Sequence, residues 1–249
     1  MNEALNLVSL KRLFDRDGFI SIPGFFNPSE MADINMVLEK VIREQVPGMP
    51  SKHAFYEDKN DAGSLKQLQD LHIYEPYFQR LLTGGRIEHL TQVLLEEKVI
   101  GKNLQYFNKP AQIGKPTPPH QDGYYFKLEP PTAATVWLAL EDVDEENGCV
   151  RYIKGSHLRG MRPHGRSNIL GFSQGISDYS EADKAAEINL PAKAGDLLVH
   201  HALTIHRADG NQSINRSRKA LGFVYFATSA IEDVVAKEAY LKELEKNFL

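Results

Sequence analysis

The chain of 249 residues carries 29 Lys and Arg against 33 Asp and Glu, and its net charge of −4 gives no reason to expect nucleic-acid or membrane partners, which need concentrated positive charge. Hydrophobic residues make up 42%, enough for a sizeable core, and the single cysteine, Cys149, excludes an internal disulfide and any multi-cysteine metal site. No apolar run reaches the roughly 18 residues of a membrane-spanning helix, and the N-terminus lacks a signal-peptide pattern, so we expect a cytoplasmic protein.

Residues 1–97 are predicted to be mainly helical. Leucines at helical spacing indicate a first helix over about residues 7–17. The tetrapeptide NPSE at residues 27–30 is typical of a helix start, because it offers a capping side chain, a proline where no N–H is needed and a capping-box glutamate. Two further helices are expected near residues 64–82 and 86–97.

Between residues 98 and 228 the pattern changes to short β-branched or aromatic segments separated by Gly, Pro, Asn and Asp. Few helix-length segments lie between them, which favours an antiparallel sandwich or barrel over a parallel sheet. Residues 158–186 are the exception, a long irregular stretch that we interpret as a functional insertion or lid. Residues 229–249 are predicted to form a C-terminal helix. The whole chain, 1–249, is interpreted as one mainly β domain with flanking helices.

The strongest chemical signal is the segment PPHQDGYYF, in which His120 and Asp122 are two residues apart. In extended backbone such residues project to the same side, so an imidazole and a carboxylate can converge on one ion. The pair alone is also compatible with a plain hydrogen bond. GDLLVHHALTIH offers a third ligand from His200, His201 or His206. Two histidines and one carboxylate form the facial triad of non-haem Fe(II) oxygenases, although a catalytic zinc uses the same ligand types.

Arg218 begins another apolar segment, 12 residues after His206. A 2-oxo acid that chelates iron must have its far carboxylate held, and arginine does so with two hydrogen bonds. The alternative is that Arg216, Arg218 and Lys219 form a solvated turn.

Taken together, the motifs resemble the phytanoyl-CoA dioxygenase family of Fe(II)/2-oxoglutarate oxygenases over about residues 14–228. The motifs, in chain order, are GFISIPGFFNPSEM, HQD, VWLAL, NGCVRYIKGSH, GDLLVHHALTIH and RKA. The resemblance implies a double-stranded β-helix (jelly roll, cupin-like) flanked by helices, in agreement with the strand pattern.

The same resemblance implies that His120, Asp122 and His206 are the iron ligands. His206 matches the family's position better than the two earlier histidines because it closes the segment GDLLVHHALTIH. Halogenases of this superfamily replace the acid of the His-x-Asp pair with a small residue. Because Asp122 is present here, hydroxylation or a related oxidation is favoured.

For the cosubstrate, the resemblance implies that Arg218 pairs with the distal carboxylate of 2-oxoglutarate. Arg216 stays an alternative, because the gap from the last histidine is a residue longer than in many relatives. Trp137 and Gln105 match positions near 2-oxoglutarate, although a purely structural role fits each of them equally well.

Substrate contacts are harder to infer. Tyr124, Tyr125 and Phe126 follow the iron pair directly and could wall the pocket, but aromatic side chains also fill cores. Arg162 and His164, in the 158–186 segment, could carry cations to an anionic substrate, or could belong to a solvated loop.

The sequence thus predicts an Fe(II)- and 2-oxoglutarate-dependent dioxygenase that uses O2 to hydroxylate, or otherwise oxidise, a small organic substrate. A zinc-dependent hydrolase on the same triad is the alternative enzyme. A non-catalytic jelly-roll binding protein is the alternative of another class. The sequence predicts neither the substrate nor the oligomeric state.

Overall fold

The computed structural model describes residues 6–169 and 172–248. Its helices and short 3-10 turns are α1 Leu7–Asp17, α2 Pro28–Glu44, η1 Val46–Gly48, η2 Ala62–Ser64, α3 Leu71–Tyr74, α4 Pro76–Leu82, α5 Arg86–Leu95, α6 Gly123–Phe126, η3 Ser156–Arg159, α7 Glu181–Ala185 and α8 Val234–Phe248. Its strands are β1 Phe19–Ile22, β2 Ala54–Tyr56, β3 Leu65–Leu68, β4 Val99–Lys109, β5 Thr117–His120, β6 Leu128–Glu129, β7 Ala133–Ala139, β8 Val150–Ile153, β9 His164–Ile169, β10 Phe172–Ile176, β11 Glu187–Leu190, β12 Leu197–His201, β13 His206–Ala208, β14 Arg218–Ala227 and β15 Ile231–Glu232.

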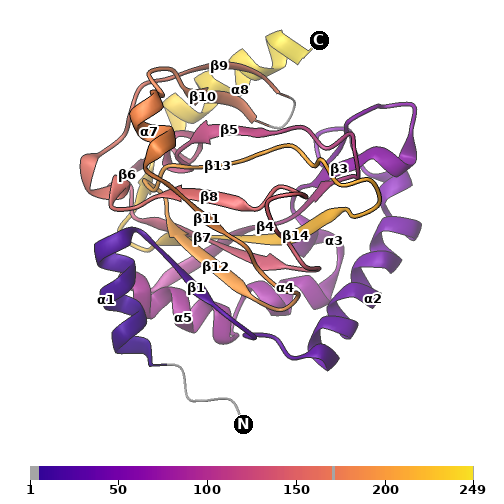
Figure 1. Cartoon of the computed structure of the whole chain (residues 1–249), viewed down its shortest axis with the longest axis horizontal. Helices are drawn as coiled ribbons and strands as arrows, with labels where there is room; N and C mark the ends of the chain where they lie inside the picture. Colours follow the sequence, from indigo (N-terminus) through magenta and orange to yellow (C-terminus); the bar gives the residue numbers. More distant parts are fainter. Residues whose placement is uncertain (1–5, 170–171, 249) are drawn as a thin grey trace.

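Two antiparallel sheets dominate the described part of the chain (Figure 1). The larger has seven strands in the order β1-β12-β7-β14-β4-β3-β2, and the smaller has four in the order β11-β8-β13-β5. A buried cluster that includes Phe19, Trp137, Tyr152 and Leu198 joins strands of both sheets. The architecture is the double-stranded β-helix with flanking helices that the sequence predicted, and this prediction is confirmed.

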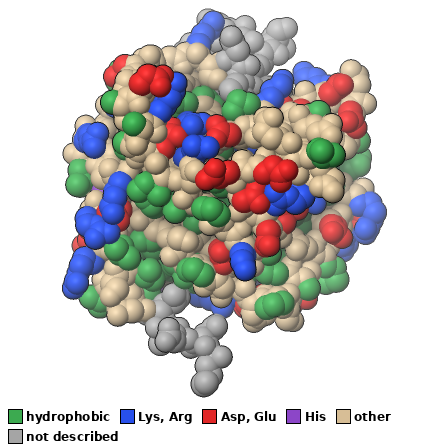
Figure 2. Space-filling view, in the orientation of Figure 1, with side chains coloured by type: hydrophobic (Ala, Val, Ile, Leu, Met, Phe, Trp, Pro, Cys, Tyr) green, Lys and Arg blue, Asp and Glu red, His purple; other side chains and the backbone are tan. Residues whose placement is uncertain are grey.

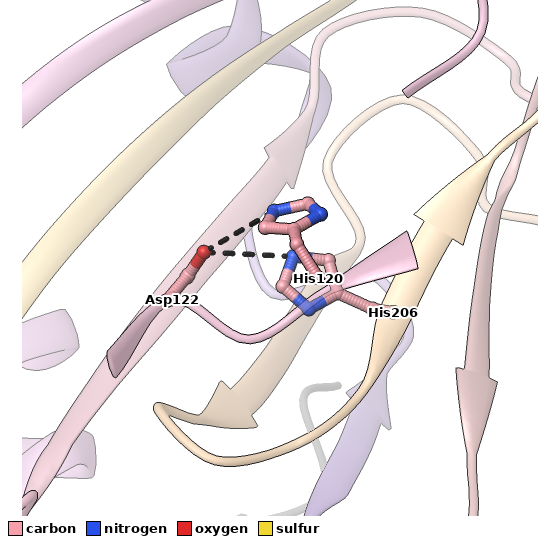
Figure 3. A group of neighbouring side chains, drawn as sticks. All are labelled: His120, Asp122 and His206. Atoms are coloured by element: carbon pink, nitrogen blue, oxygen red, sulfur yellow. Dashed lines mark ion pairs between the residues drawn. The ribbon is translucent and has the colours of Figure 1, made fainter. Parts of the chain in front are cut away.

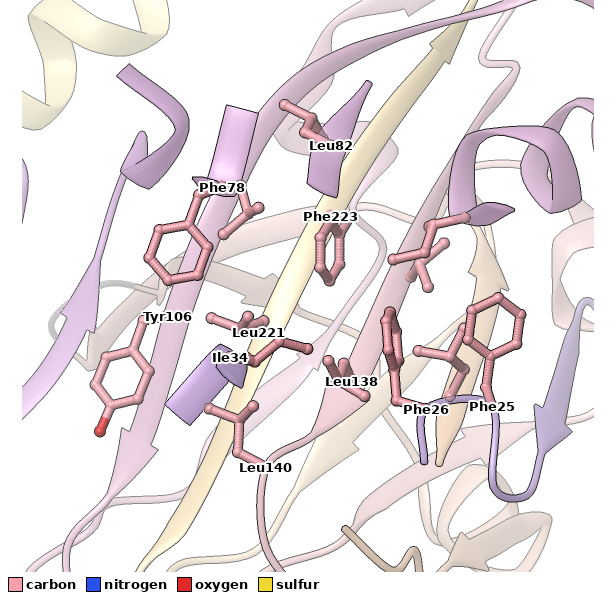
Figure 4. Close-up of a cluster of buried hydrophobic side chains, with 14 of the residues drawn as sticks. Phe25, Phe26, Ile34, Phe78, Leu82, Tyr106, Leu138, Leu140, Leu221 and Phe223 are labelled. Atoms are coloured by element: carbon pink, nitrogen blue, oxygen red, sulfur yellow. The ribbon is translucent and has the colours of Figure 1, made fainter. Parts of the chain in front are cut away.

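The outer face of the large sheet is covered by helices α1 to α5, whose apolar side chains pack on it (Figure 4). Residues alternate between the two faces along each strand, as the two-residue repeat of extended backbone requires. In β14, Leu221 and Phe223 belong to the helix-covered core, whereas Ala220 lies in the cluster between the sheets. The same strands therefore build a stabilising face and a face toward the small sheet.

Helix α2 begins as its sequence predicts. The Asn27 side chain accepts a hydrogen bond from the Glu30 N–H at 3.0 Å, and the Glu30 carboxylate accepts one from the Asn27 N–H at 2.8 Å. This reciprocal capping satisfies two N–H groups that a helix start leaves unpaired. Ile34, Leu38 and Val41 then lie on one buried stripe against the sheet.

The prediction of a helix over residues 64–82 is wrong at its start. Residues 65–68 form β3, which pairs with β4, and all four are buried, including Lys66 and Gln67. This short strand lies between β4 and β2, and because it turns polar side chains inward, its sequence has no apolar alternation to reveal it. The remaining helix divides into α3 and α4, because a proline at position 76 disfavours helical backbone at the residue before it.

Residues 158–186 are more regular than expected. Strands β9 and β10 pair antiparallel as a hairpin, and α7 follows. Gly175 of β10 lies so close to β5 that an added Cβ would be 3.2 Å from the Pro118 Cβ. The hairpin therefore packs beside the strand that ends in His120. The C-terminal helix is also later than predicted, because Ile231–Glu232 pairs with β6 as β15 and α8 begins at Val234.

The face in Figure 2 carries acidic and basic side chains interspersed. Over the small sheet, Arg151 pairs with Asp209 at 2.5 Å, and Arg207 pairs with both Glu187 and Asp209. Among the described residues, no helix is both long and apolar enough to cross a membrane.

Candidate metal centre and its pocket

His120 and His206 meet because their strands pair. His120 ends β5, His206 begins β13, and the two residues are direct partners in the antiparallel register. Directly opposite residues of neighbouring strands project on the same face, and the two imidazole centroids are 4.1 Å apart. Asp122, two residues after His120 and directly before α6, turns its carboxylate toward both rings (Figure 3).

The three side chains are spaced to bind one ion. The Asp122 Oδ1 atom lies 3.4 Å from the His120 Nε2 and 3.7 Å from the His206 Nε2. These distances are long for N–H···O hydrogen bonds. Ligand atoms about 2.1 Å from one ion and at right angles would lie about 3.0 Å apart. One ligand atom from each of the three residues lies within 4.8 Å of the other two, so the three residues form a candidate metal centre.

The backbone fixes which imidazole nitrogen can bind a metal. The Nδ1 of His120 lies 2.8 Å from the Pro118 carbonyl oxygen, and that of His206 lies 3.0 Å from the Thr204 carbonyl oxygen. A carbonyl oxygen only accepts, so each Nδ1 carries the hydrogen. In the neutral imidazole the free lone pair is then on Nε2, which can act as a ligand, an orientation that neighbouring groups commonly impose on metal-binding histidines.

Protonation states agree with metal binding. Burial lowers the pKa of His206 well below its ordinary value, and the neighbouring His120 and His200 lower it further, so the ring is neutral at pH 7. Burial alone would raise the pKa of Asp122, but the surrounding histidines outweigh it and hold that pKa well below its ordinary value. His206 is thus a neutral imidazole and Asp122 a carboxylate, the states in which these two groups bind metals.

The triad opens into a pocket between the sheets, and the pocket contains Trp137 and Arg218. Arg218 is 4% exposed and donates from Nε to the Gly148 carbonyl at 3.1 Å. Its guanidinium carbon lies 5.5 Å from the centre of the Trp137 ring. Burial lowers the pKa of Arg218 to about 10, so the side chain stays charged at pH 7. Among the described residues no carboxylate forms an ion pair with it, which leaves this cation suited to an anionic ligand.

The alternative arginine lies elsewhere. Arg216 pairs at the surface with Asp144, at 2.9 Å, and with Glu146, and it does not line the pocket. Gln105 is on the pocket side of β4 but is not among the lining residues, and it accepts a hydrogen bond from Gln67 at 3.1 Å.

The three aromatic residues of α6 contact different parts of the structure. The Tyr125 ring centre is 5.8 Å from that of His120, and its hydroxyl donates to the Gln174 carbonyl at 2.6 Å. Tyr124 stacks on His164, with ring centres 4.3 Å apart. Phe126 packs against Phe226 in a separate apolar cluster. None of the three lines the pocket of the triad, and their contact with substrate stays a prediction.

The two candidates from the insertion are held by local contacts. Arg162 pairs with Asp178 at 2.9 Å and with Asp183 at 2.8 Å. His164 accepts the Gln121 N–H at 3.2 Å, and burial lowers its pKa to about 4. Neither residue lines the pocket. The His164 contact connects the hairpin to the segment after β5, and the Arg162 ion pairs hold the residues between β10 and α7 and the start of α7.

Sequence reasoning missed several pocket residues. Thr135 lies two residues before Trp137 in β7, and the alternation of that strand could have placed both on the pocket side. Lys66 and Gln67 also line the pocket, but their strand was predicted as helix.

Comparison with known proteins gives consistent results. The family model described as phytanoyl-CoA dioxygenase (PhyH) matches residues 14–220. A relative named phytanoyl-CoA dioxygenase 1, from Oryza sativa subsp. japonica, is 31% identical over 191 residues, which cover 72% of this chain and 66% of that protein. A Caenorhabditis briggsae protein, named phytanoyl-CoA dioxygenase domain-containing protein 1 homolog, is 25% identical over 257 residues. The match covers 85% of this chain and 88% of that protein.

Among solved structures, the crystal structure of the epimerase SnoN in complex with Fe3+, alpha ketoglutarate and nogalamycin RO is similar. It matches with a TM-score of 0.74 and 24% identity over 91% of this chain and 85% of that chain. The similarity extends over nearly the whole fold described above.

Proposed function

Since the chain belongs to the phytanoyl-CoA dioxygenase family, whose members are non-haem Fe(II)/2-oxoglutarate-dependent oxygenases, we propose that it hydroxylates, or otherwise oxidises, a small organic substrate. The observation that carries this proposal is the joint placement of two kinds of group in one pocket. One is a triad of two histidines and a carboxylate, and the other is a buried arginine without an ion-pair partner among the described residues.

The residues present fit both Fe(II) and 2-oxoglutarate. Two imidazole nitrogens and one carboxylate oxygen suit Fe(II) and leave coordination positions open. Arg218 would hold the distal carboxylate of 2-oxoglutarate, because a buried cation without a counter-ion gains most from a charge-assisted pair. Trp137, beside the guanidinium, would pack against the cosubstrate.

When bound, Fe(II) supplies the activation of O2, coupled to the decarboxylation of 2-oxoglutarate to succinate and CO2. The side chains of the pocket orient the metal ligands and the cosubstrate. The Pro118 and Thr204 carbonyls hold the Nδ1 side of each imidazole, which leaves Nε2 as the metal-binding atom, and Arg218 would fix the direction of the cosubstrate. Trp137, Val150 and Ala208, all buried in the pocket wall, exclude water from the reacting groups.

The side chains that line the pocket favour a polar substrate. Gln67 is 3% exposed and Asn108 is 9% exposed, and both line the pocket. The side-chain oxygens Oε1 of Gln67 and Oδ1 of Asn108 have no hydrogen-bond partner among the described residues. Buried polar groups are rarely left unpaired, so these two acceptors favour a substrate with hydroxyl or amine donors.

The test is turnover by the full chain loaded anaerobically with Fe(II) and then exposed to air with 2-oxoglutarate. A panel of small acids, amines and alcohols is screened for succinate and for products heavier by one oxygen atom. We expect succinate only when iron, 2-oxoglutarate and O2 are all present, and a substrate that increases its rate of formation.

Two variants accompany this assay. Asp122→Ala should form no succinate, whereas Arg216→Leu, which alters a surface arginine outside the pocket, should keep full turnover. A chain that neither consumes 2-oxoglutarate nor binds it in the presence of Fe(II) would refute the proposal. Full turnover by Asp122→Ala would refute the ligand assignment.

A further inference from the structure

The two oxygens of the Asp122 carboxylate have different surroundings. Oδ1 faces the Nε2 atoms of His120 and His206, at 3.4 and 3.7 Å. Oδ2 lies on the other side and accepts two hydrogen bonds, from the Thr135 hydroxyl at 2.5 Å and from the His200 Nε2 at 3.0 Å. One oxygen is therefore directed at the candidate metal position, and the other is held by the protein.

The donor direction at His200 follows from its two partners. A carboxylate only accepts, so the Nε2 of His200 carries the hydrogen that reaches Asp122. In the neutral ring its Nδ1 then accepts, and the Tyr152 hydroxyl lies 2.9 Å from it. Burial raises the pKa of Tyr152 above its ordinary value, which keeps that hydroxyl protonated. The hydrogen bonds thus run in one direction, from Tyr152 to His200 to Asp122.

These three supporting side chains are rigidly placed. Thr135 and His200 are direct partners in the register between β7 and β12, so both project on the pocket side of the large sheet. His200 is 3% exposed and Tyr152 is fully buried, with its ring stacked on Phe19 at 4.6 Å. The candidate ligands His120 and His206, in contrast, lie on the small sheet. One sheet carries ligand imidazoles and the other carries most of the support for the carboxylate.

We propose that His200, with Thr135 and Tyr152, is a positioning residue that restricts Asp122 to binding the metal through Oδ1 alone. The proposal rests on the proposed function of this pocket. Chelation through both oxygens would require Oδ2 to give up hydrogen bonds from two buried donors, which is costly. A single-oxygen ligand keeps three positions of a six-coordinate ion open, and 2-oxoglutarate and O2 together need all three.

The same contacts explain why His200 is not a fourth ligand. Its ring centre is only 4.2 Å from that of His206. However, its Nε2 hydrogen is directed to Asp122 and its Nδ1 accepts from Tyr152, so neither nitrogen has a lone pair left for a metal.

The experiment measures Mn2+ binding to the full chain by anaerobic titration calorimetry, with no cosubstrate present. Removing a group that orients a metal ligand typically costs about 10–100-fold in affinity. We expect His200→Phe to weaken Mn2+ binding by about that factor and His200→Gln, whose amide can still donate to Oδ2, to recover most of it. Tyr152→Phe should have a smaller effect in the same direction.

The matched control is His201→Phe, the same change at the next residue. His201 is paired with Ala134 and faces the helix-covered side, near Phe14, so its loss should leave Mn2+ affinity unchanged. The number of water ligands on bound Mn2+, counted by electron paramagnetic resonance in 17O-labelled water, reports the binding mode directly. It should fall by one in His200→Phe, where Oδ2 of Asp122 loses one of its two donors and can bind the metal as well.

Wild-type affinity and an unchanged water count in a folded His200→Phe variant would overturn the proposal. If that variant does not fold, Thr135→Val and Tyr152→Phe carry the same test, and wild-type behaviour of both would overturn it equally. Because Mn2+ binding needs no turnover, these results are separate from the failure of the oxygenase assay. A chain that binds Mn2+ as expected but forms no succinate would contradict only the proposed function.

Discussion

The two faces of the seven-stranded sheet are made from alternate residues of the same strands, yet they carry different side chains. On the helix-covered face, Val136, Leu138 and Phe223 pack in an apolar core. On the facing side, Thr135 and Trp137 line the pocket of the candidate metal centre. Along β12 the change takes a single residue, because His200 contacts Asp122 whereas His201 lies near Phe14.

This difference separates stability from chemistry within one sheet. The outer face buries apolar area and stabilises the fold, as hydrophobic burial does in general. The inner face instead buries ionisable groups, among them Arg218 and Lys109, which are direct partners across β14 and β4. Burial lowers the pKa of Lys109 well below its ordinary value, and the charge of Arg218 lowers it further. We therefore expect changes on the two faces to affect different measurements.

The largest effect is expected from Asp122→Ala, which removes one of three candidate ligands. Turnover and Fe(II) affinity should fall by more than the roughly 100-fold that loss of an outer-shell contact can cost. Metal titration and a succinate assay measure both. Cooperative thermal unfolding of the variant would show that the loss is not one of structure, and wild-type Fe(II) affinity would contradict the ligand assignment.

On the outer face, Phe223→Ala should act on stability alone. Phe223 is fully buried in the apolar core, and truncating such a side chain costs about 3–5 kcal/mol. Urea unfolding measures the loss, while Fe(II) affinity, measured below the unfolding transition, should stay at the wild-type value. A large fall in affinity of the folded variant would mean that the two faces are not independent.

An intermediate effect is expected from Arg218→Leu. Losing hydrogen bonds to a charged group costs about 1.5–3 kcal/mol, so KM for 2-oxoglutarate should rise about 10–100-fold. The free energy of unfolding should not fall, because the substitution removes a buried cation that has no ion-pair partner among the described residues. Arg216→Leu is the control, and a KM increase there instead would move the cosubstrate role to Arg216.

The smallest effect concerns pH. Burial, followed by the neighbouring charges of His157 and His200, lowers the pKa of His201 to about 4 from an ordinary 6.5. Between these pH values His201 is protonated in the unfolded chain but not in the folded chain. The free energy of unfolding therefore falls as the pH drops from 6.5 towards 4. In His201→Asn the slope of unfolding free energy against pH should decrease by roughly one proton.

An unchanged slope in His201→Asn would show that His201 is protonated as readily in the folded chain as in the unfolded one.

The sequence predicted what local spacing encodes. The two-residue interval from His120 to Asp122 indicated that the two side chains lie close together, at the end of β5 and in the turn that follows it, and the apolar run before His206 indicated a second strand. The capping residues of α2 likewise specified where that helix begins.

The remaining features depend on pairing between distant segments, which leaves little local trace. The Lys66 and Gln67 side chains of β3 are buried and line the pocket. The polar residues of this strand therefore resemble those on the exposed side of a helix. The contacts of Asp122 with Thr135 and His200 join residues 13 and 78 positions away. Such contacts exist only once the sheets face each other.

The central claim, that the inner face binds Fe(II) and 2-oxoglutarate together, is tested most directly by an anaerobic absorbance titration. Adding 2-oxoglutarate to the chain loaded with Fe(II) should produce a weak charge-transfer band in the visible region. The band should saturate at one cosubstrate per chain and be lost in Asp122→Ala. A wild-type chain that binds Fe(II) but shows no such band at saturating 2-oxoglutarate would contradict the account.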